Sequence, residues 1–210
     1  MERITSISDA KEIMADNFIG PDELSLITDK IDFFVPKIIP FIPFSANELN
    51  IKRLDYILVF GLSKMKNRRP ITIKTLRSHF GIDDKILEPC FYNQDWYMNE
   101  DFVNIGLKNE WFLIRKKIIE NTRGINPDGL KRSYGLPSAI QCAFVFFSYY
   151  FINCGELLWA NDFVWCSDVD SNGDMIYVGR YVDVNGFSKN GFSVHRHLRI
   201  RSNYGIIDSL

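Results

Sequence analysis

One stretch near the end of this 210-residue chain decides its fold: Phe192-Ser193-Val194-His195-Arg196-His197-Leu198-Arg199-Ile200-Arg201. Apolar and polar residues alternate along it, which is the period of a β-strand with one buried face. The apolar face carries Phe192, Val194, Leu198 and Ile200, with Arg196 as its exception. The other face carries Ser193, His195, His197, Arg199 and Arg201. The stretch therefore predicts a strand whose polar face presents two imidazole and two guanidinium groups.

Two further strand segments precede this stretch, at Phe163–Cys166 and at Met175–Val182. Turn-forming sequences follow them, Asp170–Asp174 after the first segment and Val184–Gly186 after the second. Upstream, the segment from Ser138 to Ile152 is apolar and begins with a capping serine, which predicts a helix. We therefore expect a C-terminal helix followed by antiparallel strands.

The first half of the chain mixes helices with short strands. Caps and apolar stripes predict helices at Ser6–Ala15, from Pro21 onward, and at Thr72–Gly81. Apolar runs predict strands at Leu54–Phe60, Asp95–Tyr97 and Glu110–Ile114, and prolines predict an extended segment at Val35–Phe44. The fold class is therefore α+β. A soft boundary near residue 90 separates an N-terminal elaboration (1–90) from a ligand-binding region (91–210), unless both form one domain.

Composition limits the classes of function. The net charge of −1 gives no global attraction to nucleic acid or to an anionic membrane, so any basic site has to be local. The chain is 46% hydrophobic and 14% aromatic, enough to bury a core without disulfides. Its four cysteines lack metal-ligand spacing, and neither a signal peptide nor a membrane span is recognisable. We expect a soluble, cytoplasmic protein with no membrane partner.

The polar face of the 192–201 strand is the candidate binding surface. Arginine holds carboxylate or phosphate groups at two points, and histidine donates or accepts hydrogen bonds. This predicts a surface for a protein or for a small polar or anionic ligand, and a merely solvated strand face is an equally weighted alternative. The predicted contact residues are Arg180, Tyr181, Asn190, His195, His197, Arg199, Arg201, Asn203 and Tyr204.

Metal chemistry has two weaker candidates. Residues 168–174 match the first half of a calcium loop through Asp168, Asp170, Asn172 and Asp174, but Gly179 stands where the loop needs glutamate. A hairpin turn is the simpler interpretation, so we expect no cofactor and keep calcium as the alternative. His195 and His197, with Asp168 or Asp170, are the alternative metal centre of a metal-assisted hydrolase.

Two other classes of function have less support. The basic segment Lys64–Arg77 is an alternative nucleic-acid contact, but the sequence after Gly81 is short and acidic where a recognition helix would be needed. No nucleophile motif, P-loop, dinucleotide fingerprint or H-E-x-x-H motif occurs. We therefore expect binding without catalysis.

Three segments of the last 75 residues or so resemble the C-type-lectin-like fold of formylglycine-generating enzymes and their bacterial paralogues. They are the helix entry Gly135–Phe144, the strand Val164–Ser167 and the closing stretch Arg196–Ile206. The chain departs from the enzymes in having no cysteine after Cys166, where they carry their catalytic pair. The resemblance instead implies a binding use of the scaffold. In this use the chain resembles the variable proteins of diversity-generating retroelements, which display side chains on a rigid sheet. This resemblance implies that the protein comes from a phage or a bacterium. It also implies association with a virion as an alternative to a cytoplasmic location.

Overall fold

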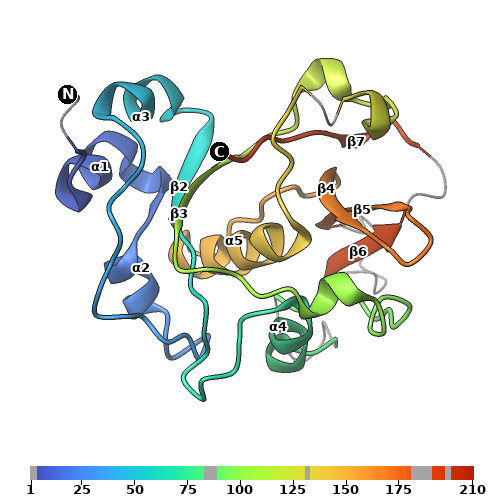
Figure 1. Cartoon of the computed structure of the whole chain (residues 1–210), viewed down its shortest axis with the longest axis horizontal. Coiled ribbons are helices and arrows are strands. Elements are labelled where there is room, and N and C mark those ends of the chain that lie inside the picture. Colours follow the sequence, from blue (N-terminus) through green and yellow to red (C-terminus); the bar gives the residue numbers. More distant parts are fainter. Residues whose placement is uncertain (1–3, 83–88, 131–132, 181–190, 197–199) are drawn as a thin grey trace.

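Helix α5 (Ala139–Ile152) lies at the centre of the computed structural model, between a three-stranded and a four-stranded sheet (Figure 1). The structure describes residues 4–82, 89–130, 133–180, 191–196 and 200–210. The helix begins with a capping box in which Ser138 Oγ accepts a hydrogen bond from Gln141 N and Gln141 Oε1 accepts one from Ser138 N. Its residues are buried almost without interruption from Ala139 to Tyr149, so every face of the helix has to be covered. The predicted helix is confirmed.

The first sheet has the order β1-β2-β3. Strand β1 (Phe18–Ile19) pairs parallel to β2 (Tyr56–Phe60), and β2 pairs antiparallel to β3 (Trp111–Arg115). Nearby lie the helices α1 (Ile7–Met14), α2 (Pro21–Leu26) and α3 (Ala46–Lys52). Single 3-10 turns occur at Ala15–Asn17, Asp101–Asn104, Glu120–Thr122 and Pro127–Gly129. The predictions of α1, α2, β2 and β3 are confirmed, whereas α3 and β1 were not predicted.

Helix α4 (Ile73–Phe80) packs directly on α5. The rings of Phe80 and Phe147 are stacked with their centroids 3.8 Å apart. The segment that follows was predicted as a strand at Asp95–Tyr97, and this prediction is wrong, because the chain turns there. The indole Nε1 of Trp96 donates a hydrogen bond to Val194 O at the edge of the second sheet. The aromatic pair that suggested a strand thus anchors a turn.

The second sheet has the order β6-β5-β4-β7. Strands β4 (Phe163–Val169), β5 (Met175–Arg180) and β6 (Phe192–Arg196) form an antiparallel meander, and β7 (Tyr204–Gly205) pairs parallel to β4. Residues 197–199, which belong to the strand predicted at 192–201, lie outside the described residues. The α+β class and the C-terminal helix-then-strands order are confirmed.

Both faces of this sheet are covered. The face toward α5 joins the main core through Val164, Cys166, Ile176, Val178, Phe192 and Val194. The opposite face carries a second cluster, formed by Phe163, Trp165, Met175, Tyr177, Tyr204 and Ile206. Aromatic residues alternate with the core residues along β4 and β5, so the opposite face of this sheet is largely apolar there.

Strand pairing and the main core both span the predicted soft boundary near residue 90. Strand β2 comes before that position and pairs with β3 after it, from Tyr56↔Arg115 to Phe60↔Trp111. The main core also draws residues from both sides. The soft boundary therefore crosses one sheet and one core. Within the described ranges, no helix has the length and apolar character that crossing a membrane requires.

Replacing Ser138 with alanine tests the start of α5. Loss of the N-cap is expected to lower the free energy of unfolding by about 1 kcal/mol. Ser78→Ala is the matched control, since Ser78 is exposed within α4 and its hydroxyl only donates to Lys74 O. Urea denaturation measures both variants. Equal stability of the two would contradict the role of the cap.

Candidate functional site

A hollow of about 510 Å³ opens over the second cluster, beside the edge of β6. We call it the His195 hollow. It brings together four of the predicted contact residues, His195, Arg201, Asn203 and Tyr204. The structure adds Ser193, which the predicted polar face contained but the predicted contact residues did not, and four residues that sequence reasoning missed: Tyr92, Gln94, Phe163 and Tyr177.

The floor of the His195 hollow is aromatic. Tyr177 lies opposite His195 in the β5–β6 register, and the two rings are stacked with centroids 5.2 Å apart. Tyr204 packs on Tyr177 at 4.6 Å, and Phe163 meets His195 edge to face at 5.7 Å. Such mutually packed rings form a rigid base.

Gly179 allows this floor to form. It lies between Phe163 on β4 and Ser193 on β6, both of which pair with it. A Cβ atom at this position would lie 3.0 Å from Phe163 Cδ1 and still closer to the carbonyl oxygen of Asp162. Only a residue without a side chain therefore lets the Phe163 ring reach across the sheet toward His195.

His195 is neutral at physiological pH. Burial and, to a smaller extent, the positive charge of Arg201 lower the pKa of the imidazole to about 4. Gln94 Nε2 lies 3.5 Å from His195 Nδ1. When the amide donates to Nδ1, the proton of the neutral ring is on Nε2, which then acts as a hydrogen-bond donor.

The charge of the His195 hollow is positive. Arg201 is exposed and forms no ion pair within the described part of the chain, and none of the described lining residues is acidic. The nearest carboxylate in sequence to the floor, that of Asp162, is held by two hydrogen bonds from Arg123, of 2.7 and 3.0 Å. Burial, and then the hydrogen bond with Tyr204, raise the pKa of Tyr177, so its hydroxyl carries no charge. The arrangement favours an anion.

The other predicted contact residues divide into two groups. Arg180 is buried and lies on the α5 face of the sheet, because it alternates with Gly179 and pairs with Phe192. Its assignment to an exposed binding surface is therefore wrong. Tyr181, Asn190, His197 and Arg199 lie outside the described residues.

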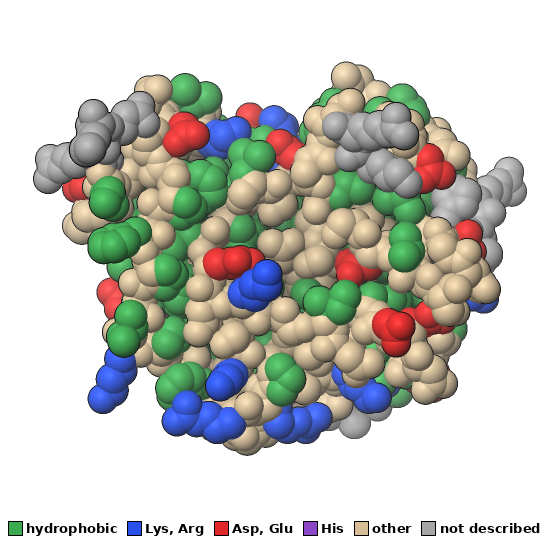
Figure 2. Space-filling view, viewed as in Figure 1, with side chains coloured by type: hydrophobic (Ala, Val, Ile, Leu, Met, Phe, Trp, Pro, Cys, Tyr) green, Lys and Arg blue, Asp and Glu red, His purple; other side chains and the backbone are tan. Residues whose placement is uncertain are grey.

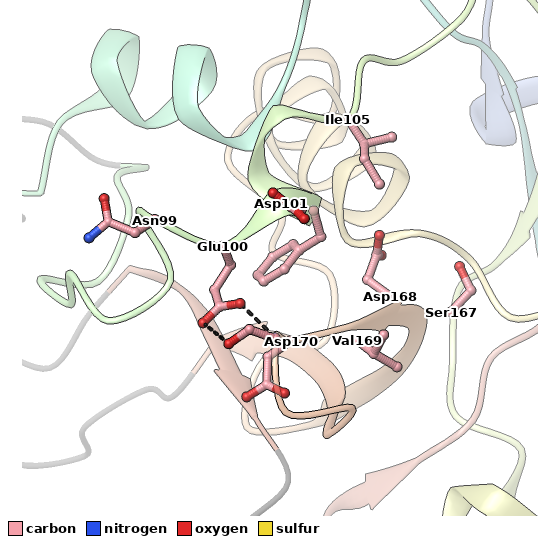
Figure 3. Close-up of a pocket in the computed structure, with 10 residues that line it drawn as sticks. Asn99, Glu100, Asp101, Ile105, Ser167, Asp168, Val169 and Asp170 are labelled. Carbon is pink, nitrogen blue, oxygen red and sulfur yellow. Dashed lines mark hydrogen bonds between the residues drawn. The ribbon is translucent and has the colours of Figure 1, made fainter.

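A second hollow, of about 540 Å³, is lined by two of the four predicted calcium-loop residues, Asp168 and Asp170 (Figure 3). Its carboxylates point to separate partners. Asp168 Oδ2 accepts a hydrogen bond from Ala139 N at the start of α5, and Asp170 Oδ1 accepts from the backbone N–H groups of Asn172 and Asp174. Glu100 accepts from the backbone N–H and the hydroxyl of Ser171. In the described ranges no three acidic, histidine or cysteine side chains converge on a metal position.

Residues 170–174 form the turn of the β4–β5 hairpin, as the simpler interpretation predicted. Gly173 has φ 86°, which suits a glycine in such a turn. The geometry also disfavours the alternative metal centre of a hydrolase, which would combine His195 with Asp168 or Asp170. Asp168 contacts α5 and Asp170 contacts Arg196, whereas His195 lies on the other face of the sheet with Tyr177. These carboxylates and His195 do not face one centre.

The basic segment Lys64–Arg77 lies at the lower edge of the molecule, where blue side chains gather in Figure 2. Part of its charge is used in internal contacts. Arg77 pairs with Asp95 and donates to Gln94 O, while Lys66 donates to Thr28 O and lies 3.7 Å from Asp32. Nucleic-acid binding by this segment stays a prediction.

No protein-family model, no curated protein and no solved structure matches this chain. The His195 hollow is consequently the basis of the functional argument. It combines a cationic group at the rim, neutral donors and acceptors beside it, and an aromatic floor beneath.

Gly179→Ala tests the construction of the floor. The added methyl group is expected to force β4 and β5 apart and to lower the free energy of unfolding by roughly 2 kcal/mol or more. Gly129→Ala is the control, because a Cβ atom there meets nothing within 4 Å. Thermal or urea unfolding of both variants measures the difference, and a Gly179→Ala protein as stable as the control would refute the steric argument.

The neutral state of His195 predicts a pH dependence of stability. Because the folded-state pKa lies near 4 and the unfolded value near 6.5, this contribution is complete above pH 6.5. It is lost as the pH falls toward 4, and it amounts to on the order of 3 kcal/mol. Urea unfolding at pH 7.5 and 4.5 should show a smaller loss in His195→Gln than in the original protein. An equal loss in both would show that His195 is not neutralised by folding.

Proposed function

We propose that this protein is a non-catalytic ligand-binding module that holds a small polar, anionic ligand in the His195 hollow. One observation carries the proposal. An exposed arginine without an ion-pair partner among the described residues, Arg201, stands beside a neutral histidine in a hollow whose described lining has no acidic side chain. An anion is the ligand that this charge distribution stabilises.

The binding mode follows from the donors available. The guanidinium of Arg201 offers a two-point fork for a carboxylate or phosphate group. His195 adds a neutral Nε2–H donor, and its ring is held between Tyr177, Phe163 and the amide of Gln94. Asn203 Nδ2 donates to Asn161 O, which fixes the amide at the rim. Donors held in place before binding lose little conformational entropy when the ligand arrives.

The surroundings of His195 favour ligand binding without catalysis. A general-base histidine is commonly oriented by a carboxylate and placed beside a nucleophile. Here the described partner of Nδ1 is the Gln94 amide. The nearby Ser193 is buried, and its hydroxyl faces its own strand at Gly191 O, 3.4 Å away. The described residues of the hollow thus supply no activated nucleophile.

The resemblance to C-type-lectin-like variable proteins is part of this proposal. Under this resemblance, the second sheet is the rigid scaffold and the residues that line the His195 hollow form the variable binding surface. The partner of that surface is a protein or a small ligand. The helix-then-meander order of α5, β4, β5 and β6 supports the proposal at the level of element order. Relatives that differ mainly at the hollow would support display, whereas an invariant His195 would argue for one fixed ligand.

An NMR titration tests the proposed anion site. The chain has three histidines, so the His195 ring protons can be assigned with His195→Gln. Inorganic phosphate, citrate and cyclohexanecarboxylate are added separately at pH 7.5. At least one of these anions is expected to shift the His195 signal in a saturable way, and Arg201→Gln should weaken that binding about 10-fold or more.

Arg53→Gln is the control for this titration, because Arg53 is an exposed arginine at the end of α3, far from the hollow in the fold. Its affinity is expected to equal that of the original protein. A His195 signal that none of the anions moves, or an Arg201→Gln protein that binds as tightly as the control, would overturn the proposed function.

A further inference from the structure

We infer that the ligand carries a planar aromatic ring next to its anionic group. This inference rests on the proposed function, because it names the class of anion that the His195 hollow takes. The aromatic ring is the part of the ligand that contacts the floor of the hollow, whereas the anionic group is the part that contacts Arg201.

The floor of the hollow is made of aromatic rings. Phe163, Tyr177 and Tyr204 are each only 6% exposed, so a small part of each side chain is open to the hollow. Their rings are packed edge to face or tilted against one another, with Phe163 at 5.7 Å from Tyr177 and 5.3 Å from Tyr204. A further ring can join such a group at the spacing that aromatic pairs prefer.

Hydrogen-bonding capacity argues against a sugar. A pyranose buries several hydroxyl groups, and each unpaired one costs free energy. The hydroxyls of Tyr177 and Tyr204 lie 3.3 Å apart and bond to each other, and the Asn203 amide donates to Asn161 O. No carboxylate is present among the described lining residues to accept sugar hydroxyls. A ring with few donors leaves no such group unpaired.

Arg201 and the aromatic floor lie close enough together to contact one and the same ligand. Arg201 lies close enough to both His195 and Tyr177 to shift the electrostatics of each. A ring resting against the floor therefore places a substituent within reach of the guanidinium. A hollow of about 510 Å³ is within the range of small-molecule sites and accommodates a ligand of one or two rings.

Three matched compounds test this inference on the intact protein. Benzoate is planar and charged, cyclohexanecarboxylate has the same charge without the planar ring, and benzamide has the ring without the charge. Benzoate is expected to bind roughly 3- to 10-fold more tightly than cyclohexanecarboxylate, the range expected for an added aromatic contact. It should also bind at least about 10-fold more tightly than benzamide. Only the aromatic compounds should cause a ring-current shift of the His195 signal.

Phenyl phosphate separates the sources of the anion. If it binds more tightly than benzoate, the natural ligand is a phosphate-bearing ring, and if benzoate binds more tightly, it is an aromatic acid. Equal affinities for benzoate and cyclohexanecarboxylate would overturn the aromatic inference and leave the anion site standing. Benzamide binding as tightly as benzoate, or the absence of a His195 shift with every compound, would overturn the proposed function together with it.

Discussion

The burial of α5 is the constraint on which the rest of the structure depends. A helix whose residues are apolar on all sides cannot lie on a surface, so it needs protein on every face. The first sheet, α4 and one face of the second sheet supply that cover, with Phe147 stacked on Phe80 and Phe146 packed 5.1 Å from Phe192. Residues from both halves of the chain thus pack on the same helix, which joins them in one fold.

This constraint also decides on which face of the second sheet the proposed site lies. Because α5 takes one face, the side chains of Ser193 and His195 on β6 lie on the other face. There the aromatic residues of β4 and β5 pack on one another and on Ile119, Leu130, Tyr134, Leu136, Ile200 and Ile206. The His195 hollow is the part of this face that the chain does not fill within its described residues.

Sequence reasoning succeeded where the signal was local. The Ser138 cap and the apolar run after it predicted α5, and the alternation in residues 192–196 predicted which side chains share a face. Arg180 was misplaced although its signal was present, since the same alternation groups it with Ile176 and Val178 in the core. Tyr92 and Gln94 could not be predicted, because they reach the hollow through the pairing of Phe91 with Phe192, about a hundred residues along the chain.

The proposed ligand site differs from the rest of the molecule in how its arginine is placed. Arg115, Arg123 and Arg196 each contact a carboxylate, which offsets the cost of placing them at partly buried positions. Arg201 has no such partner in the described ranges, and its charge lies near an imidazole that burial keeps neutral. Arg201 is thus a solvent-exposed cation beside a neutral imidazole, at the rim of an aromatic hollow. A bound anion would supply the missing partner, and the aromatic floor beneath would determine which anions fit.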